Sequence, residues 1–278
     1  MKPPLLLLDV SNLCFRHYFA LPKLMHDDAP TAVLFGFLRE LVSLSERFRS
    51  VRFVFAFDSG VSLRKKACPT YKSNRHSAER EEVKRRELIG EQINNLRDIL
   101  SDLGYANVFG AKGYEADDVI ASISLDNVED DVVIVSNDRD LYQLLDRGTS
   151  IWNGKYTVDL ETFEREWKIP PHLWATVKAI AGCLTDCVEG IRGVGEKTAA
   201  KYIRDELKSS LKTHKAIVEG AKMWGENILL TRLPYEGCPK FTIREDDFSA
   251  DAWKGVCDKY GFDTLRRTWP GRKRFLFA

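Results

Sequence analysis

Apolar runs that end in carboxylates constrain this chain more than any other feature of its sequence. The runs at 5–8, 53–57 and 132–135 lead to Asp9, Asp58 and Asp138 respectively. Continuous apolar runs of this length are typical of strands that are buried on both faces of a parallel sheet. Because ligands of such a sheet bind beyond the carboxyl ends of its strands, we expect these acids to meet in one crevice.

Four more carboxylates extend this acidic set. They are Glu115, Asp117, Asp118 and Asp140. Crowded carboxylates repel one another and raise their own pKa values unless something positive lies between them. Hard Mg²⁺ or Mn²⁺ ions suit an all-oxygen site, so the pattern predicts metal-assisted phosphate chemistry. Any one of these acids alone could instead cap a helix or begin a turn, and those in 115–118 suit a helix start in any case.

The bulk composition indicates a soluble protein with a real core. The 278 residues are 44% hydrophobic and 30% charged, with a net charge of only +1. No apolar run approaches the roughly 20 residues that span a bilayer, and the N-terminus does not resemble a signal peptide. The six cysteines lack the spacing of a disulfide framework, which favours reduced thiols and a cytoplasmic location, the host cytoplasm if a phage encodes the chain.

The order of predicted elements indicates an α/β fold. A strand at 4–9, a helix at 32–48 and a strand at 52–58 form a crossover unit. Further elements are predicted as a helix at 80–103, a strand at 106–110, a helix at 116–125, a strand at 131–136, and helices at 171–181, 196–206, 214–230 and 249–260. Asn153-Gly154 predicts a hairpin that closes the sheet. We therefore expect a mostly parallel sheet with helices on both faces, followed by a helical region.

Two other patterns point to nucleic acid. The string 193–199, with Gly193, Gly195, Lys197 and Thr198, resembles a helix–hairpin–helix whose amides could hold a phosphate; the alternative is a simple turn. The stretch 61–90 carries nine basic and four acidic residues, a local net charge of +5. Within it, the basic and aromatic side chains that suit a nucleic-acid strand are Arg64, Tyr71, Lys72 and Arg75. The alternative is a solvated basic surface.

Taken together, these motifs resemble the 5′ nuclease (flap endonuclease) superfamily, both the bacteriophage 5′-exonucleases and the nuclease domain of bacterial DNA polymerase I. The resemblance runs over about residues 4–205 and is weak beyond 206. The matching motifs are Asp9-Val-Ser-Asn12, Thr31 with Gly36-Phe37, Asp58 with Arg64, Tyr71-Lys72 and Arg75, Glu115-Ala-Asp117-Asp118, Asp138-x-Asp140-x-x-Gln143-Leu144, Asp186, and the 193–199 string.

The resemblance implies a PIN-like nuclease core at 1–168 with a helical arch at about 64–100. A helical DNA-binding region at 169–278 would carry a helix–hairpin–helix at about 187–206. Two Mg²⁺ or Mn²⁺ ions are implied, with K⁺ a further candidate at the hairpin. Asp9, Asp58, Glu115 and Asp117 would surround the first ion. Asp118, Asp138, Asp140 and Asp186 would serve the second, while Lys72 and Arg75 would act on the scissile phosphate.

The resemblance also implies the substrates and partners. These are DNA with a 5′ flap or a 5′ single-stranded end, RNA–DNA hybrids in primer removal, and a replicative polymerase or single-strand-binding protein. The chain would act as a monomer and would not associate with a membrane. The implied activity is that of a structure-specific 5′–3′ exonuclease or flap endonuclease that hydrolyses phosphodiesters by two-metal-ion catalysis.

One departure from the family pattern leaves alternatives open. Where the bacterial and phage pattern reads Gly-Asp-x-x-Asp-Asn, this chain has Cys183 and Cys187 in place of the first Asp and the Asn. A neutral thiol is a poor ligand for Mg²⁺. The first alternative is therefore a module that binds branched DNA but cleaves it poorly. Two others are a nuclease of related acid layout that cuts RNA, and an unrelated metal-dependent phosphatase.

Overall fold

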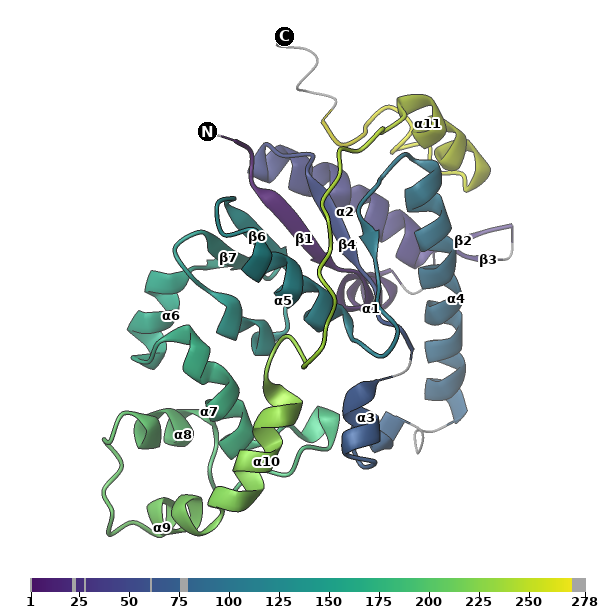
Figure 1. Ribbon diagram of the computed structural model, residues 1–278. Helices are drawn as coiled ribbons and strands as arrows, with labels where there is room; N and C mark the ends of the chain where they lie inside the picture. Colours follow the sequence, from purple (N-terminus) through teal and green to yellow (C-terminus); the bar gives the residue numbers. More distant parts are fainter. Residues whose placement is uncertain (1, 22–23, 28, 61, 76–79, 272–278) are drawn as a thin grey trace.

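A six-stranded sheet in the order β5-β4-β1-β6-β7-β8 forms the centre of the protein (Figure 1). The computed structural model describes residues 2–21, 24–27, 29–60, 62–75 and 80–271. The strands are β1 (Leu5–Asp9), β4 (Phe53–Ala56), β5 (Val108–Phe109), β6 (Val132–Val135), β7 (Thr149–Trp152) and β8 (Thr157–Val158). All neighbours from β5 to β7 pair in parallel, and only β8 pairs antiparallel, with β7. The expected mostly parallel sheet is confirmed, and the predicted Asn153-Gly154 hairpin joins β7 to β8.

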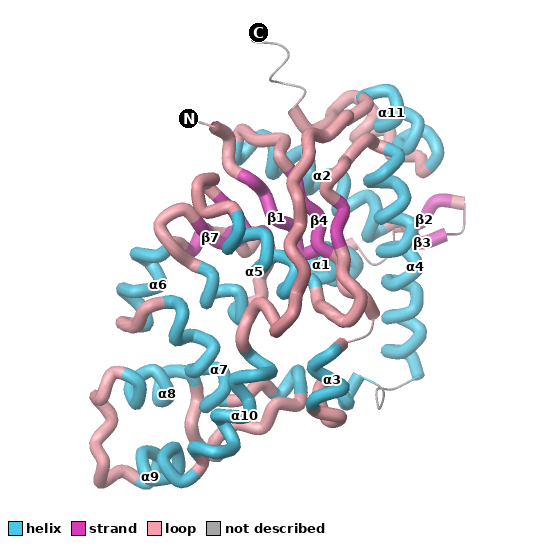
Figure 2. The backbone as a smooth tube through the Cα atoms, in the orientation of Figure 1, coloured by secondary structure: helices cyan, strands magenta, loops and turns pink. Residues whose placement is uncertain are grey.

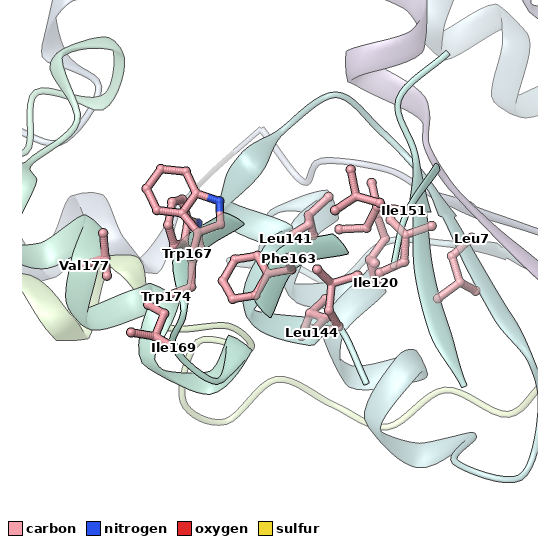
Figure 3. Close-up of a cluster of buried hydrophobic side chains, with 14 of the residues drawn as sticks. Leu7, Ile120, Leu141, Leu144, Ile151, Phe163, Trp167, Ile169, Trp174 and Val177 are labelled. Carbon is pink, nitrogen blue, oxygen red and sulfur yellow. The ribbon is translucent and has the colours of Figure 1, made fainter. Parts of the chain in front are cut away.

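Alternate residues of each strand enter separate cores on the two faces of the sheet. Leu5 and Leu7 of β1 belong to one buried cluster, and Leu6 and Leu8 belong to the other. This follows from the two-residue repeat of a strand, in which successive side chains point to opposite faces. Both faces are apolar, so both must be covered. Figure 3 shows the first core, where Leu7 and Ile151 of the sheet pack with Ile120 and Leu141.

Helices cover both faces. Those whose buried residues belong to the first core include α5 (Ala116–Asp126), α6 (Leu160–Trp167) and α7 (Trp174–Ala181). Those that enter the second core are α1 (Val10–Ala20), α2 (Ala32–Phe48), α4 (Arg80–Asp102) and α11 (Ala250–Lys259). Within the described residues, no helix has both the length and the apolar character needed to cross a bilayer.

A helical region extends from one end of the sheet (Figure 2). It contains the short 3₁₀ helices η3 (Pro171–Leu173) and η4 (Leu184–Asp186), and the helices α8 (Glu196–Ile203), α9 (Lys212–Glu219) and α10 (Ala221–Thr231). The single helix predicted at 214–230 is wrong, because Gly220 ends α9 and begins α10. A Cβ on Gly220 would lie 2.2 Å from the terminal Cδ1 atom of Ile191, so a side chain here would require Ile191 to move.

The segment predicted as an arch contains α3 (Leu63–Ala67), the 3₁₀ turn η1 (Ser73–Arg75) and most of α4. Residues 76–79, between η1 and α4, lie outside the described residues. The remaining elements are a small antiparallel pair, β2 (Met25–His26) with β3 (Ala29–Pro30), and the 3₁₀ helix η2 (Arg139–Leu144).

After α10 the chain returns along the front of α5 to reach α11 (Figure 1). Ser122 of α5 donates a hydrogen bond to the carbonyl of Pro239 at 2.8 Å, and the Asp247 amide donates to the carbonyl of Gly104 at 2.8 Å. Gly104 has a φ of +90°, and a Cβ there would lie 1.8 Å from the Asp247 carbonyl oxygen. The glycine that ends α4 is therefore also required for the returning segment to pack.

Candidate active site

The predicted acids converge on one cleft at the carboxyl end of the sheet. Asp9 ends β1, Asp58 follows β4, Asp138 follows β6, and Glu115 and Asp117 lie at the start of α5; all five line the same cleft of about 930 Å³. In the sheet, β1 has β4, the next strand along the chain, as one neighbour and β6 as its other neighbour. The cleft thus lies where the strand order reverses, the place where open α/β sheets bind ligands.

An adjoining cavity of about 390 Å³ continues the cleft toward the helical region. It shares Glu115, Asp117 and Asp138 with the first cavity, and its lining adds Asp140 and Asp186. Seven of the eight acids assigned to metal ions therefore face one continuous space. The predicted convergence of distant carboxylates is what the folded chain shows.

Asp9 is held by donors on both of its oxygens. Its Oδ1 accepts the Asn12 amide at 3.0 Å, which caps α1, and its Oδ2 accepts the Ser136 hydroxyl at 2.9 Å. Ser136 Oγ in turn accepts the Asp138 amide at 3.1 Å. A carboxylate has about four lone-pair positions, so Asp9 keeps capacity for a further ligand while its orientation is fixed. Capping and metal binding are thus compatible roles for this residue.

Burial and mutual repulsion make these acids difficult to ionise. Burial, then the charge of Asp58, raises the pKa of Asp9 to about 7. Burial, then Asp138, raises the pKa of Asp117 well above its ordinary value. Burial, then Asp140, raises the pKa of Asp138. A divalent cation in the cleft would favour the charged forms and lower all three pKa values.

Lys72 lies between two of the acids. Its Nζ is 2.6 Å from Glu115 Oε2 and 3.8 Å from Asp186 Oδ1. Burial alone would raise the pKa of Glu115, but the attraction and hydrogen bond of Lys72 lower it below its ordinary value. The Lys72 backbone, with a φ of +53°, donates to the Asp186 carbonyl at 2.8 Å. The loop that carries Lys72 therefore docks directly on the loop that carries Asp186.

A second lysine, Lys178 of α7, also reaches the site and was not found from the sequence. Its Nζ lies 2.9 Å from Asp140 Oδ1 and 3.3 Å from Glu196 Oε1. Burial would lower the pKa of Lys178, but the charge of Asp140 raises it above its ordinary value. The other oxygen of Glu196, Oε2, binds Arg139 at 2.9 Å. The only sequence signal was a lysine on an otherwise apolar helix, which does not reveal its partners.

Asp118 and Arg64 do not fit the roles expected of them. Asp118 is fully buried, and its two oxygens receive Arg64 at 2.6 and 2.7 Å. They also accept the amides of Glu115 at 3.0 Å and Tyr235 at 2.7 Å. Arg64 is 2% exposed and donates to the carbonyls of Leu230 and Arg232. The pair joins α3, α5 and the end of α10, and neither side chain has a surface to offer an ion or DNA.

The other predicted DNA contacts divide into three cases. Tyr71 is 4% exposed and donates to Glu115 Oε2 at 3.1 Å, an arrangement that does not fit base stacking. The side chain of Arg75 lies outside the described residues. The third case is the predicted hairpin at the start of α8. There Gly193, Gly195 and Lys197 are exposed, Thr198 is half-buried, and Cβ positions built on both glycines meet open space.

Whether the site fits a divalent ion depends on its donors. Within the described ranges, no three Asp, Glu, His or Cys side chains are arranged so that they could hold an ion as they stand. The donor set is nevertheless almost entirely carboxylate oxygen, which suits Mg²⁺ or Mn²⁺, and its raised pKa values show uncompensated negative charge. The residues therefore fit the ion in their chemistry.

The two cysteines that depart from the family pattern lie beside the acids. Cys183 lines the smaller cavity and its thiol is 3.0 Å from the Thr185 hydroxyl. Cys187 is partly exposed, and hydrogen bonds from Asn74 and Ser73 lower the pKa of its thiol. Both positions therefore belong to the loop that presents Asp186.

Comparison with known proteins gives a consistent picture. The family model described as "5'-3' exonuclease, N-terminal resolvase-like domain" matches residues 4–168. The "5'-3' exonuclease" of Bacillus subtilis is 35% identical over 214 residues, covering 72% of this chain and 70% of that protein.

Solved structures share the fold. A bacteriophage T5 5′-exonuclease with bound zinc ions matches with a TM-score of 0.72 at 23% identity, covering 94% of this chain and 98% of that one. The T5 D15 flap endonuclease in a pseudo-enzyme–product complex with DNA and metal ions matches with a TM-score of 0.69 at 23% identity, covering 94% and 97%.

Relatives of greater length match over part of their sequence. DNA polymerase I of Deinococcus radiodurans is 32% identical over 206 residues, which span 72% of this chain but only 21% of the polymerase. The segment 4–168 that the family model matches contains every predicted metal-binding acid of the carboxylate cleft except Asp186. From the family model, the Bacillus relative and that cleft, we conclude that the chain belongs to the 5′–3′ exonuclease family.

Proposed function

We propose that this protein is a divalent-metal-dependent 5′ nuclease that hydrolyses DNA phosphodiesters near 5′ ends, as a structure-specific exonuclease or flap endonuclease. One observation carries the proposal: carboxylates from β1, β4, β6, α5 and the 183–187 loop line a single cleft together with Lys72. The T5 structures with bound metal ions and DNA support the metal and the substrate class.

The acids fall into two groups that correspond to two cation positions. Asp9, Asp58 and Asp117 face the first, with Glu115 beside it; Asp138, Asp140 and Asp186 face the second. Bound ions would supply a hydroxide nucleophile and stabilise the leaving oxygen. Asp118 is left out of this set because Arg64 and two amides already occupy it.

The chain's own cations would bind the substrate. Lys72 lies within reach of both acid groups, so its ammonium can move from Glu115 to a phosphoryl oxygen and stabilise charge that develops there. The exposed glycines and Lys197 at the start of α8 would hold a backbone phosphate without reading sequence. K⁺ at this hairpin, a cytoplasmic location, monomeric action, and the division into regions 1–168 and 169–278 stay predictions.

The test is cleavage of a DNA duplex that carries a labelled 5′ flap, in Mg²⁺ and then in Mn²⁺, with a chelator as the blank. Asp138→Asn should abolish cleavage while flap binding by fluorescence anisotropy persists. Glu129→Gln, an exposed acid-to-amide change outside the cleft, is the matched control. An Asp138→Asn protein that cuts at the normal rate would reject the assignment. An RNA–DNA hybrid in parallel tests the prediction of primer removal.

Cys183 favours one other candidate, a module that binds branched DNA and cleaves it poorly. The thiol stands in the cavity of Asp138, Asp140 and Asp186, where an acid would add a ligand. Flap binding without cleavage in either metal would support this alternative.

A further inference from the structure

The two cation positions differ in what already neutralises them. At the first position, no lysine or arginine among the described residues forms an ion pair with Asp9, Asp58 or Asp117, although Lys72 Nζ binds the neighbouring Glu115 at 2.6 Å. At the second position, by contrast, Lys178 Nζ is 2.9 Å from Asp140 Oδ1. The same cavity is lined by Cys183, whose thiol brings no negative charge in its neutral form.

Lys178 is fixed in this position from its other side. Its Nζ is also 3.3 Å from Glu196 Oε1, and Arg139 holds the second oxygen of Glu196 at 2.9 Å. Glu196 lies in the first turn of α8, which packs on α7 through the buried Ala199 and Ala200. An arriving cation would therefore have to displace an ammonium that has two anionic partners and little exposed surface, since the Lys178 side chain is 11% exposed.

We propose that the Lys178 ammonium takes the place of the second metal cation at Asp140, so that this chain binds one divalent ion tightly and a second only weakly. This inference rests on the proposed metal-dependent function and specifies its ion stoichiometry. A neutral thiol at 183 removes one ligand charge, and the lysine supplies one of the two positive charges that a second ion would bring. Lys178 acts here as a positioning residue that orients Asp140.

The expected result is a difference in affinity between the two positions. The loss of one supporting carboxylate typically weakens metal binding by about 10- to 100-fold, so the second Mn²⁺ should bind at least about 10-fold more weakly than the first. Cys183→Asp should restore the second ion. Lys178→Met should also strengthen it, because Asp140 then has no ammonium to exchange for the metal.

The test titrates Mn²⁺ into the full chain without DNA, by calorimetry and by electron paramagnetic resonance. Two Mn²⁺ ions roughly 4 Å apart couple magnetically, whereas a single bound ion does not. The wild type should bind one Mn²⁺ ion tightly and show no magnetic coupling. Cys183→Asp should bind two Mn²⁺ ions that couple. The matched control is Leu184→Asp, which adds the same charge on a side chain that is 93% exposed to solvent and should remain at one ion.

The outcomes separate this inference from the proposed function. Two ions of similar affinity in the wild type, or no stronger second ion in Lys178→Met, would overturn the role of Lys178 and leave the nuclease proposal standing. Absence of tight Mn²⁺ binding in every variant would overturn both.

Discussion

Asp117 and Asp118 are neighbours in the sequence, yet the fold gives them opposite environments. Asp117 faces the open cleft, and burial together with Asp138 raises its pKa. Asp118 points the other way, where Arg64 binds both of its oxygens. On a helix, adjacent residues lie about 100° apart, so one acid of the pair must face the sheet edge and the other the interior. Within this pair, the carboxylate that remains available to a cation is the one that no guanidinium binds.

The largest effect is expected at Asp117, the acid of the pair that faces the cleft. Asp117→Asn should lower the single-turnover cleavage rate by about 10³-fold or more, because the cleft loses a charged ligand where a metal ion contributes several kcal/mol. Its free energy of unfolding should stay close to that of wild type or rise, since a repelled charge is removed. Quenched-flow cleavage and urea unfolding measure the two quantities. A rate within tenfold of wild type would contradict the proposed role.

Substitution of the buried acid, Asp118, should instead lower the stability of the protein. Asp118→Asn should reduce the free energy of unfolding by about 3 kcal/mol, because it leaves the buried Arg64 guanidinium without its counter-charge. Urea denaturation measures this change. Asp126→Asn, at the exposed far end of the same helix, should alter it by less than about 0.5 kcal/mol. Equal stability of both variants would mean that the buried pair does not hold the site together.

A smaller effect is expected from Lys72, which belongs to the cleft but is not a ligand. Lys72→Ala should lower the single-turnover rate by roughly 10²-fold, the scale of losing one transition-state donor. Lys66→Ala, an exposed lysine on α3, is the control and should change the rate little. If both variants lose activity equally, the effect comes from the overall positive charge of the segment and not from the contact with Glu115.

The smallest effect, expressed per pH unit, is expected for the stability of the metal-free protein. Asp9 has a pKa of about 7 in the folded chain against an ordinary 3.8, so the folded state binds the extra proton between these values. Stability contributed by this group must therefore fall as pH rises from about 4 to 7, by at most about 1.4 kcal/mol per pH unit.

The measurement is a difference, because Glu40 and Glu115 have lowered pKa values and titrate in the opposite direction. Urea midpoints of wild type and Asp9→Asn should diverge between pH 4 and 7, with the variant gaining at higher pH. Added Mg²⁺ should shrink the divergence. Parallel stability profiles of the two proteins would show that the pKa of Asp9 is not raised in the folded state.

Most of the fold follows from local sequence patterns. Helix α2 occupies the predicted range 32–48, and the strands lie within one or two residues of their predicted ends. Helix α1 was not predicted, because Asp9 ends β1 and caps α1 at once, so no turn residue separates the two elements.

The site was harder to complete because its remaining parts depend on contacts between distant segments. The acids could be found because strand ends converge by topology. The burial of Arg64 could not, since its partners Leu230 and Arg232 lie about 170 residues further along the chain. The role of Lys178 could not be predicted for the same reason. Its partners Asp140 and Glu196 lie on other elements, whereas helical periodicity gives information only about the helix that carries the residue.

The returning segment after α10 has a consequence for how the protein comes into being. Arg64 donates hydrogen bonds to the carbonyls of Leu230 and Arg232, and Asp118 accepts one from the Tyr235 amide. All three of these partners lie far beyond the segment 4–168 that the family model matches. On the ribosome, the catalytic half emerges first and must wait for these residues. We therefore expect the nascent polypeptide to be inactive until the residues up to about 235 have been translated and have packed against Arg64 and Asp118.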